Sequence, residues 1–141
     1  MKPQKSKKRK SPVDKPFAKA FKNYEPPADV PVSEWAEKNR ILSRESSAEA
    51  GPWRNERTPY LVEIMNAFTQ RSVHEIVVMA SAQVGKTEIE MNMMGQAIDV
   101  DPGPILYVQP TKDVAAEFSV RRIAPMISCT RSSGLPVRPI S

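Results

Sequence analysis

The sequence predicts an α/β fold with a parallel sheet, and three observations indicate it. An unbroken apolar run at residues 76–80 leads into a short loop, and an amphipathic stretch at residues 88–98 leaves that loop. A second apolar run, at residues 105–109, follows a turn that contains Pro102-Gly103-Pro104. Unbroken apolar strands are typical of parallel sheets that carry helices on both faces. We therefore expect strand, helix and strand in this order.

The loop between the first strand and the helix is the most informative motif in the chain. It reads Ala80-Ser81-Ala82-Gln83-Val84-Gly85-Lys86-Thr87. A strand, a tight loop that ends in Gly-Lys-Thr and a helix form the layout of a phosphate-binding P-loop. The N–H groups of such a loop converge at the positive end of the helix dipole and can bind an anion there. The first position departs from the usual pattern, because it is alanine rather than glycine.

Each loop residue has a role under this hypothesis. Gly85 lets the backbone approach a phosphate oxygen, because it has no Cβ. The Lys86 ammonium is the predicted catalytic group and contacts the β- and γ-phosphates, while the Thr87 hydroxyl is suited to ligate Mg²⁺. The predicted nucleotide-binding residues are Ser81, Ala82, Gln83, Val84, Gly85, Lys86 and Thr87. The alternative is an ordinary strand, turn and helix with an exposed lysine.

Composition sets limits on the kind of protein. The 141 residues are enough for one domain, and the single cysteine excludes a disulfide framework and a cysteine-rich metal site, which fits a reducing compartment. No apolar run is long enough to cross a membrane. The formal net charge is +5, but the first ten residues contain six basic side chains and no acid. The high charge therefore describes a tail, and it is no argument for a basic folded surface.

The chain divides into three expected parts. Residues 1–31 are basic, proline-containing and poor in apolar side chains, which is typical of a disordered tail. Residues 32–127 hold the periodic segments and make up the expected P-loop domain. Residues 128–141 show no periodicity and form an expected irregular C-terminal tail.

Three further helices are predicted around the P-loop unit. Residues 33–42 form one, with Ser33 as N-cap. Thr58 caps the second, which has proline at its first position and ends near residue 71. Thr111 caps the third, and Pro125 ends it. Trp53, in the loop before the second helix, is expected to anchor packing.

Several sequence blocks in this order resemble one known family. They are residues 33–36 (Ser-Glu-Trp-Ala), 51–54 (Gly-Pro-Trp-Arg), 57–60 (Arg-Thr-Pro-Tyr), 81–88 (the loop with Glu88), 107–111 (Tyr-Val-Gln-Pro-Thr) and 118–127. The chain is similar across about two-thirds of its length to the N-terminal ATPase portion of a tailed-bacteriophage terminase large subunit, of the lambda-like branch. The family also tolerates a departure at the first loop position, where this chain has Ala80.

The resemblance implies a RecA- or helicase-like ATPase domain that uses ATP and Mg²⁺. Such a subunit is an ATP-driven motor and endonuclease that packages viral DNA into the capsid in the host cytoplasm. Its implied partners are double-stranded DNA, the terminase small subunit and the capsid portal, with no membrane involved. The resemblance also suggests Tyr60 as an adenine contact and Thr111 and Lys112 as DNA contacts, although packing, capping and solvation explain these three residues equally well.

Two parts of the expected enzyme have no counterpart in the sequence. ATP hydrolysis requires an apolar strand that ends in Asp-Glu, the Walker B acids, and no such strand follows residue 127. A two-metal nuclease requires a carboxylate cluster that the chain does not supply. We therefore expect an incomplete domain, a fragment produced by natural truncation or by a frameshift, that hydrolyses no ATP.

The incompleteness also bears on folding. In motors of this type the two predicted strands are not neighbours, because later strands lie between them. We expect both strands to lack hydrogen-bonding partners and the isolated chain to fold poorly or aggregate. Two other functions stay open: a different helicase-like P-loop ATPase that acts on nucleic acid, and a non-enzymatic prophage remnant.

Overall fold

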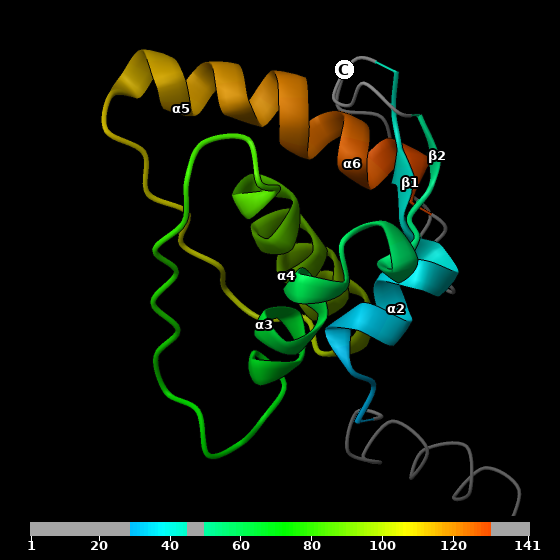
Figure 1. The fold of residues 1–141 in the computed structure, drawn as a ribbon. Coiled ribbons are helices and arrows are strands. Elements are labelled where there is room, and N and C mark those ends of the chain that lie inside the picture. Colours follow the sequence, from blue (N-terminus) through cyan, green and yellow to red (C-terminus); the bar gives the residue numbers. More distant parts are fainter. Residues whose placement is uncertain (1–28, 45–49, 131–141) are drawn as a thin grey trace, which may run out of the picture.

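The computed structural model describes residues 29–44 and 50–130. Most of the predicted basic tail and most of the predicted C-terminal tail lie outside these residues. Figure 1 shows the described part as a set of short helices around one central helix, with a small two-stranded sheet at one side. Among the described residues, no helix is long and apolar enough to cross a membrane.

Helix α4 (Lys86–Val100) is the centre of the fold, and helices α2 (Val32–Asn39) and α3 (Val62–Ala67) pack against it. The predicted helix at residues 88–98 is therefore confirmed and slightly extended. The indole N–H of Trp35 donates a hydrogen bond to Asp99 Oδ2 at 2.8 Å, which fixes α2 along the C-terminal half of α4. The main core cluster contains Val32, Trp35, Ala36, Leu42, Trp53, Leu61, Met65 and Ile89. Trp53 is buried, as predicted for a packing anchor.

A short antiparallel pair forms the sheet that the structure describes. Strand β1 (Ile41–Leu42) follows α2, and it pairs with β2 (Gly51–Pro52) so that residue 41 lies opposite residue 52. Two 3₁₀ turns, η1 (Asn55–Arg57) and η2 (Pro59–Leu61), then lead into α3. The prediction of a helix through residue 42 was wrong at this end, because the chain leaves the helix at Arg40 and becomes extended.

The two predicted parallel strands are extended segments without a strand partner in the described part of the chain. Neither residues 76–80 nor residues 105–109 are assigned to a strand, and no parallel sheet is formed among the residues described. The predicted burial of these runs on both faces is also wrong here, since Val77 and Leu106 are 82% and 89% exposed. The lack of hydrogen-bonding partners agrees with the expectation for an incomplete sheet.

The last described helical segment lies across the N-terminal end of α4 (Figure 1). It consists of α5 (Lys112–Phe118), a π-helical turn η3 (Ser119–Ile123) and α6 (Ala124–Cys129). A second, smaller apolar cluster joins it to α4 through Met91, Met94 and Met126. Because α6 continues to Cys129, the predicted irregular tail does not begin at residue 128.

Four predicted helix ends differ from the structure. Ser33 is not an N-cap: α2 begins one residue earlier, after Pro31, and the Ser33 N–H is taken by Asn66 Oδ1 of α3 at 3.1 Å. Thr58 precedes a 3₁₀ turn and its buried hydroxyl makes no cap, while α3 ends at Ala67 rather than near residue 71. Pro125 does not end the last helix, because it lies in the first turn of α6, a position that tolerates a residue without a backbone N–H.

Candidate functional site

The loop at residues 80–86 leads directly into the N-terminus of α4, as the motif predicted. Gly85 is the N-cap of α4 and adopts a left-handed conformation, with φ of 88° and ψ of 17°. A Cβ at this position would lie 3.1 Å from Leu61 Cδ1, so both the backbone angle and the close neighbour favour glycine. The N-terminus of α4 therefore follows Gly85 directly. It presents unpaired backbone N–H groups and the positive end of the helix dipole.

A second loop residue is in an unusual conformation. Gln83 has φ of 61°, and it is the non-glycine residue with positive φ in the described chain. This conformation is uncommon for a residue with a Cβ, and such residues gather at functional turns. Sequence reasoning included Gln83 in the loop but had no signal for its strain, since glycine is the residue usually expected at such a φ.

Two side chains close the loop. Lys86 Nζ donates a hydrogen bond to the carbonyl oxygen of Ala80 at 2.9 Å, so the lysine reaches back across the loop to its first position. The hydroxyl of Tyr60, from η2, donates a longer hydrogen bond of 3.4 Å to the carbonyl oxygen of Val84. The structure thus brings Tyr60 to the loop, as the predicted site required, while Thr87 lies half-buried in the first turn of α4.

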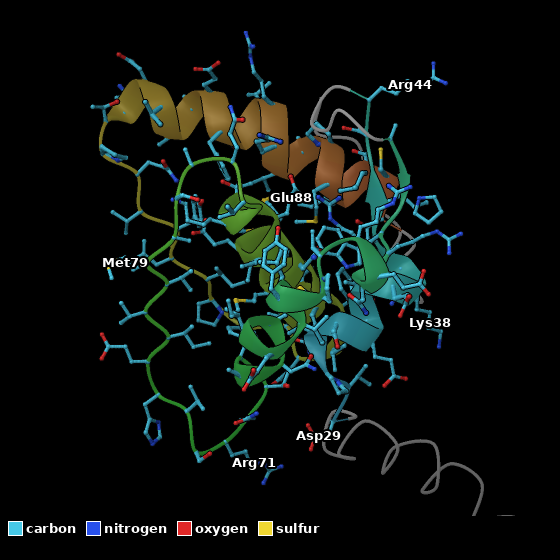
Figure 2. The ribbon with its side chains drawn as sticks, in the orientation of Figure 1. Asp29, Lys38, Arg44, Arg71, Met79 and Glu88 are labelled. Atoms are coloured by element: carbon cyan, nitrogen blue, oxygen red, sulfur yellow. The ribbon has the colours of Figure 1, made fainter. Side chains whose placement is uncertain are left out.

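A small cavity lies beside the loop, between the first extended segment and α4. Its volume is about 200 Å³, and it is lined by Ile76, Val78, Lys86, Ile89, Glu90 and Met93. Ile76 and Val78 line this cavity beside α4, while Val77 and Met79 are exposed; Figure 2 shows Met79 pointing outward from the helices. The extended segment therefore faces α4 on one side only.

A cluster of ion pairs lies in the first turn of α4, directly after the loop. It was not identified from the sequence. Glu88, in the first turn of α4, contacts Arg40 at 3.1 Å and Arg122 at 3.4 Å. Burial lowers the pKa of the Arg40 guanidinium, while the neighbouring Glu88 carboxylate opposes that shift. These partners lie 48 and 34 residues from Glu88 in the sequence, so no local pattern connects them.

The predicted DNA contacts lie at the start of α5. Thr111 is its N-cap, as predicted: the Thr111 hydroxyl accepts a hydrogen bond from the Val114 N–H at 3.3 Å. Lys112 is exposed. The neighbouring Tyr107 donates a 2.6 Å hydrogen bond to Glu90 of α4 and stacks on Phe118, with ring centroids 4.8 Å apart. Burial and the bond to Glu90 raise the pKa of Tyr107 above its usual value.

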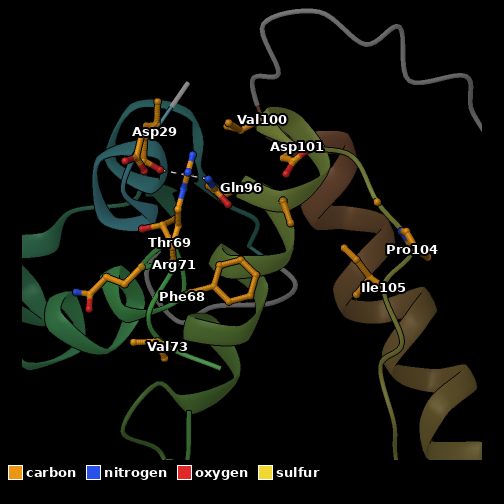
Figure 3. A pocket seen from close by; sticks show the side chains of 14 residues that line it. Asp29, Phe68, Thr69, Arg71, Val73, Gln96, Val100, Asp101, Pro104 and Ile105 are labelled. Carbon is orange, nitrogen blue, oxygen red and sulfur yellow. Dashed lines mark hydrogen bonds between the residues drawn. The ribbon is translucent and has the colours of Figure 1, made fainter. Parts of the chain in front are cut away.

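A larger cavity of about 530 Å³ lies at the other end of α4 (Figure 3). Phe68, Arg71, Val100, Asp101 and Ile105 are among its lining residues, and none of the predicted loop residues reaches it. Over the residues that the structure describes, no group of three or more His, Cys, Asp or Glu side chains is arranged to hold a metal ion. The loop at the N-terminus of α4 is therefore the candidate site.

Comparison with known proteins assigns the segment that contains this loop to a family. A family model described as "Phage terminase large subunit gpA, ATPase domain" matches residues 47–133, which include the loop, α4 and the α5–α6 segment. The chain belongs to this family. No solved structure matches the chain.

Two curated relatives are consistent with the family assignment. The large terminase subunit of Enterobacteria phage P21 is 30% identical over 101 residues, or 72% of this chain. The large terminase subunit of Escherichia phage lambda is 31% identical over 94 residues, or 67% of this chain. The chain spans only 15% and 14% of the lengths of these two relatives.

Proposed function

We propose that this chain is the nucleotide-binding part of an ATP-driven motor that packages phage DNA. The observation that carries the proposal is the loop at the N-terminus of α4, with Gly85 in the left-handed conformation and Lys86 reaching across the loop. The match to an ATPase-domain model over residues 47–133, which include this loop, supports the proposal. It also favours the terminase hypothesis over another helicase-like ATPase.

The residues of the loop fit a triphosphate with Mg²⁺. Backbone N–H groups of residues 81–85 and the first turn of α4 would surround the phosphates, and a Cβ at Gly85 would crowd the turn. Lys86 would exchange its bond to the Ala80 carbonyl for a phosphate oxygen and neutralise charge on the β- and γ-phosphates. Thr87 would offer its hydroxyl to Mg²⁺, which supplies further charge neutralisation when bound.

The remaining assignments are parts of the same proposal. Tyr60 would contact the nucleotide from η2, because its hydroxyl already reaches the loop at Val84. The extended segment before Thr111, with Lys112 beyond it, would face nucleic acid. Double-stranded DNA, a small terminase subunit and the capsid portal are the proposed partners, and the host cytoplasm is the proposed place of action. The whole motor, including its parallel sheet and its nuclease, would extend beyond what this chain contains.

Nucleotide binding tests the proposal and separates it from a non-enzymatic remnant. The 141-residue chain would be titrated with a fluorescent ATP analogue (mant-ATP) in the presence and absence of Mg²⁺. We expect Lys86→Ala to weaken binding by about 10- to 100-fold, because a hydrogen bond to a charged group contributes about 1.5–3 kcal/mol. Lys38→Ala, in the last turn of α2, removes an equal charge from a lysine that lies away from the loop (Figure 2) and should leave binding unchanged. Equal affinities for the Lys86→Ala variant and the wild type would reject the loop as the site.

A further inference from the structure

The ion-pair cluster of Arg40, Glu88 and Arg122 lies where it can control the phosphate loop. Glu88 follows Lys86 and Thr87 directly, in the first turn of α4. Its two carboxylate oxygens contact different arginines: Oε2 accepts from Arg40 at 3.1 Å and Oε1 from Arg122 at 3.4 Å. Figure 2 shows Glu88 at the end of α4 that meets the α5–α6 segment. The Glu88 carboxylate thus joins α4 to Arg40, which precedes α4 in the sequence, and to Arg122, which follows it.

Arg40 is the fixed partner of Glu88. Its side chain is 2% exposed, and it also donates to Asn92 Oδ1 at 3.2 Å and to the carbonyl oxygen of Ile41 at 2.9 Å. Asn92 is fully buried and lies one turn further along α4. A buried guanidinium that lost its carboxylate would be an uncompensated charge, so this contact holds the first turn of α4 firmly in place.

Arg122 is the adjustable partner. Its side chain is 36% exposed and its distance to Glu88 is longer than that of Arg40. Arg122 belongs to the π-helical turn η3, between α5 and α6. Turns of this kind interrupt regular α-helix and are frequent at functional sites. A shift of the α5–α6 segment would therefore change the Arg122–Glu88 contact before it changed the Arg40–Glu88 contact.

The cluster also affects the charge that an incoming phosphate meets. A lone Glu88 carboxylate, two residues from Lys86, would oppose the binding of an anion. Two guanidinium groups turn the cluster from one negative charge to one net positive charge. Loss of one guanidinium would remove one unit of positive charge near the bound anion, and because Arg122 is partly exposed and screened by salt, we expect a loss of affinity of about fivefold, well below the unscreened Coulomb value for a triphosphate.

We infer that Glu88 is the positioning residue of the phosphate loop, and that Arg122 makes nucleotide affinity depend on the placement of the α5–α6 segment. This inference rests on the proposed nucleotide site. Because α5 begins directly after the segment proposed to face nucleic acid, the Arg122 contact is a route by which that segment and the nucleotide influence each other. By thermodynamic linkage, the influence is reciprocal.

A charge-matched pair of variants tests the inference. Arg122→Gln and Arg121→Gln remove the same charge from neighbouring residues of η3. Arg121 is 77% exposed and pairs with Glu117 of α5, so it does not touch the loop helix. With mant-ATP and Mg²⁺, we expect Arg122→Gln to weaken binding by about fivefold. Arg121→Gln should stay within about twofold of the wild type, and Arg122→Lys should recover part of the loss.

Circular dichroism of each variant separates positioning from unfolding. Titrations are compared at a temperature at which Arg122→Gln and Arg121→Gln keep the wild-type helical signal, and Arg122→Met, which also removes the charge, replaces Arg122→Gln if the latter is unfolded. Equal affinities for the position-122 and position-121 variants, in a chain whose binding is weakened by Lys86→Ala, overturn the inference and leave the nucleotide site intact. A wild-type chain that binds no mant-ATP overturns the proposed site and the inference together.

Discussion

Gly95 shows how a single residue determines the packing of α4. A Cβ built on Gly95 would lie 2.4 Å from Trp35 Cη2 and 2.8 Å from Cζ3. The indole ring cannot retreat easily, because it is buried and its N–H is bonded to Asp99. The absence of a side chain at this position therefore lets α2 approach α4 closely.

We predict that Gly95→Ala destabilises the chain although alanine is the better helix former. Alanine gains about 1 kcal/mol of helix propensity over glycine, but overpacking against a rigid ring costs about 1–3 kcal/mol. The net change should be a lower midpoint of urea unfolding. Gly103→Ala is the control, because nothing lies within 4 Å of a Cβ at that position. A rise in the midpoint for Gly95→Ala would show that Trp35 has room to move.

Single residues also show which parts of the site are visible in a sequence. Gly85, Lys86 and Thr87 form a local motif with fixed spacing, and the structure places them at the helix N-terminus as that motif requires. The pairing of Arg40 and Arg122 with Glu88 could not be predicted in this way, because it depends on tertiary contacts between distant segments.

At the scale of elements, the central helix and the Thr111 cap of α5 were predictable, whereas most ends of the other helices were not. α4 was indicated by apolar residues at helical spacing and by the loop motif before it. α2 begins one residue before Ser33, and the N–H of Ser33 itself donates to a side chain of α3, Asn66, so Ser33 does not serve as the N-cap. The π turn before α6 makes room for Pro125 within the helical segment. Such tertiary effects override local preferences.

The two extended segments alternate in exposure although their sequences are uniformly apolar. Tyr107 packs toward α4, whereas Val77, Met79, Leu106 and Val108 are exposed. Apolar side chains on unpaired extended backbone favour association with other chains. The sequence pattern predicted burial on both faces, as in a parallel sheet, whereas the described chain covers these segments on one face only.

We predict that the outward apolar side chains cause self-association. Val77→Lys combined with Leu106→Lys should shift the chain toward monomer in sedimentation velocity, with unfolding free energy changed by no more than about 0.5 kcal/mol, as for other exposed sites. Ile76→Lys is the matched control, because Ile76 lines the cavity beside α4. It should lower stability instead. Unchanged association in the double variant would mean that another surface is responsible.

At the scale of the whole molecule, α4 separates two apolar clusters of unequal size. The cluster shared with α2 and α3 contains eight buried residues, whereas the cluster shared with the α5–α6 segment contains three, all methionines. The smaller cluster is supplemented by the contact between Arg122 and Glu88 and by packing of α6 on β1. Because local stability follows the number of buried apolar contacts, we expect the α5–α6 segment to open first.

Hydrogen exchange of backbone amides tests this order. Met126 is the member of the small cluster that α6 supplies, and Met126→Ala should cost about 2–4 kcal/mol by loss of burial and by cavity formation. We expect amides of α5 and α6 to lose protection while those of α2 keep theirs, because the larger cluster does not depend on α6. Met65→Ala, in that larger cluster, should instead lower protection throughout. An equal loss in α2 and α6 for Met126→Ala would indicate a single cooperative unit, in which movement of α5–α6 without unfolding of α4 is not accessible.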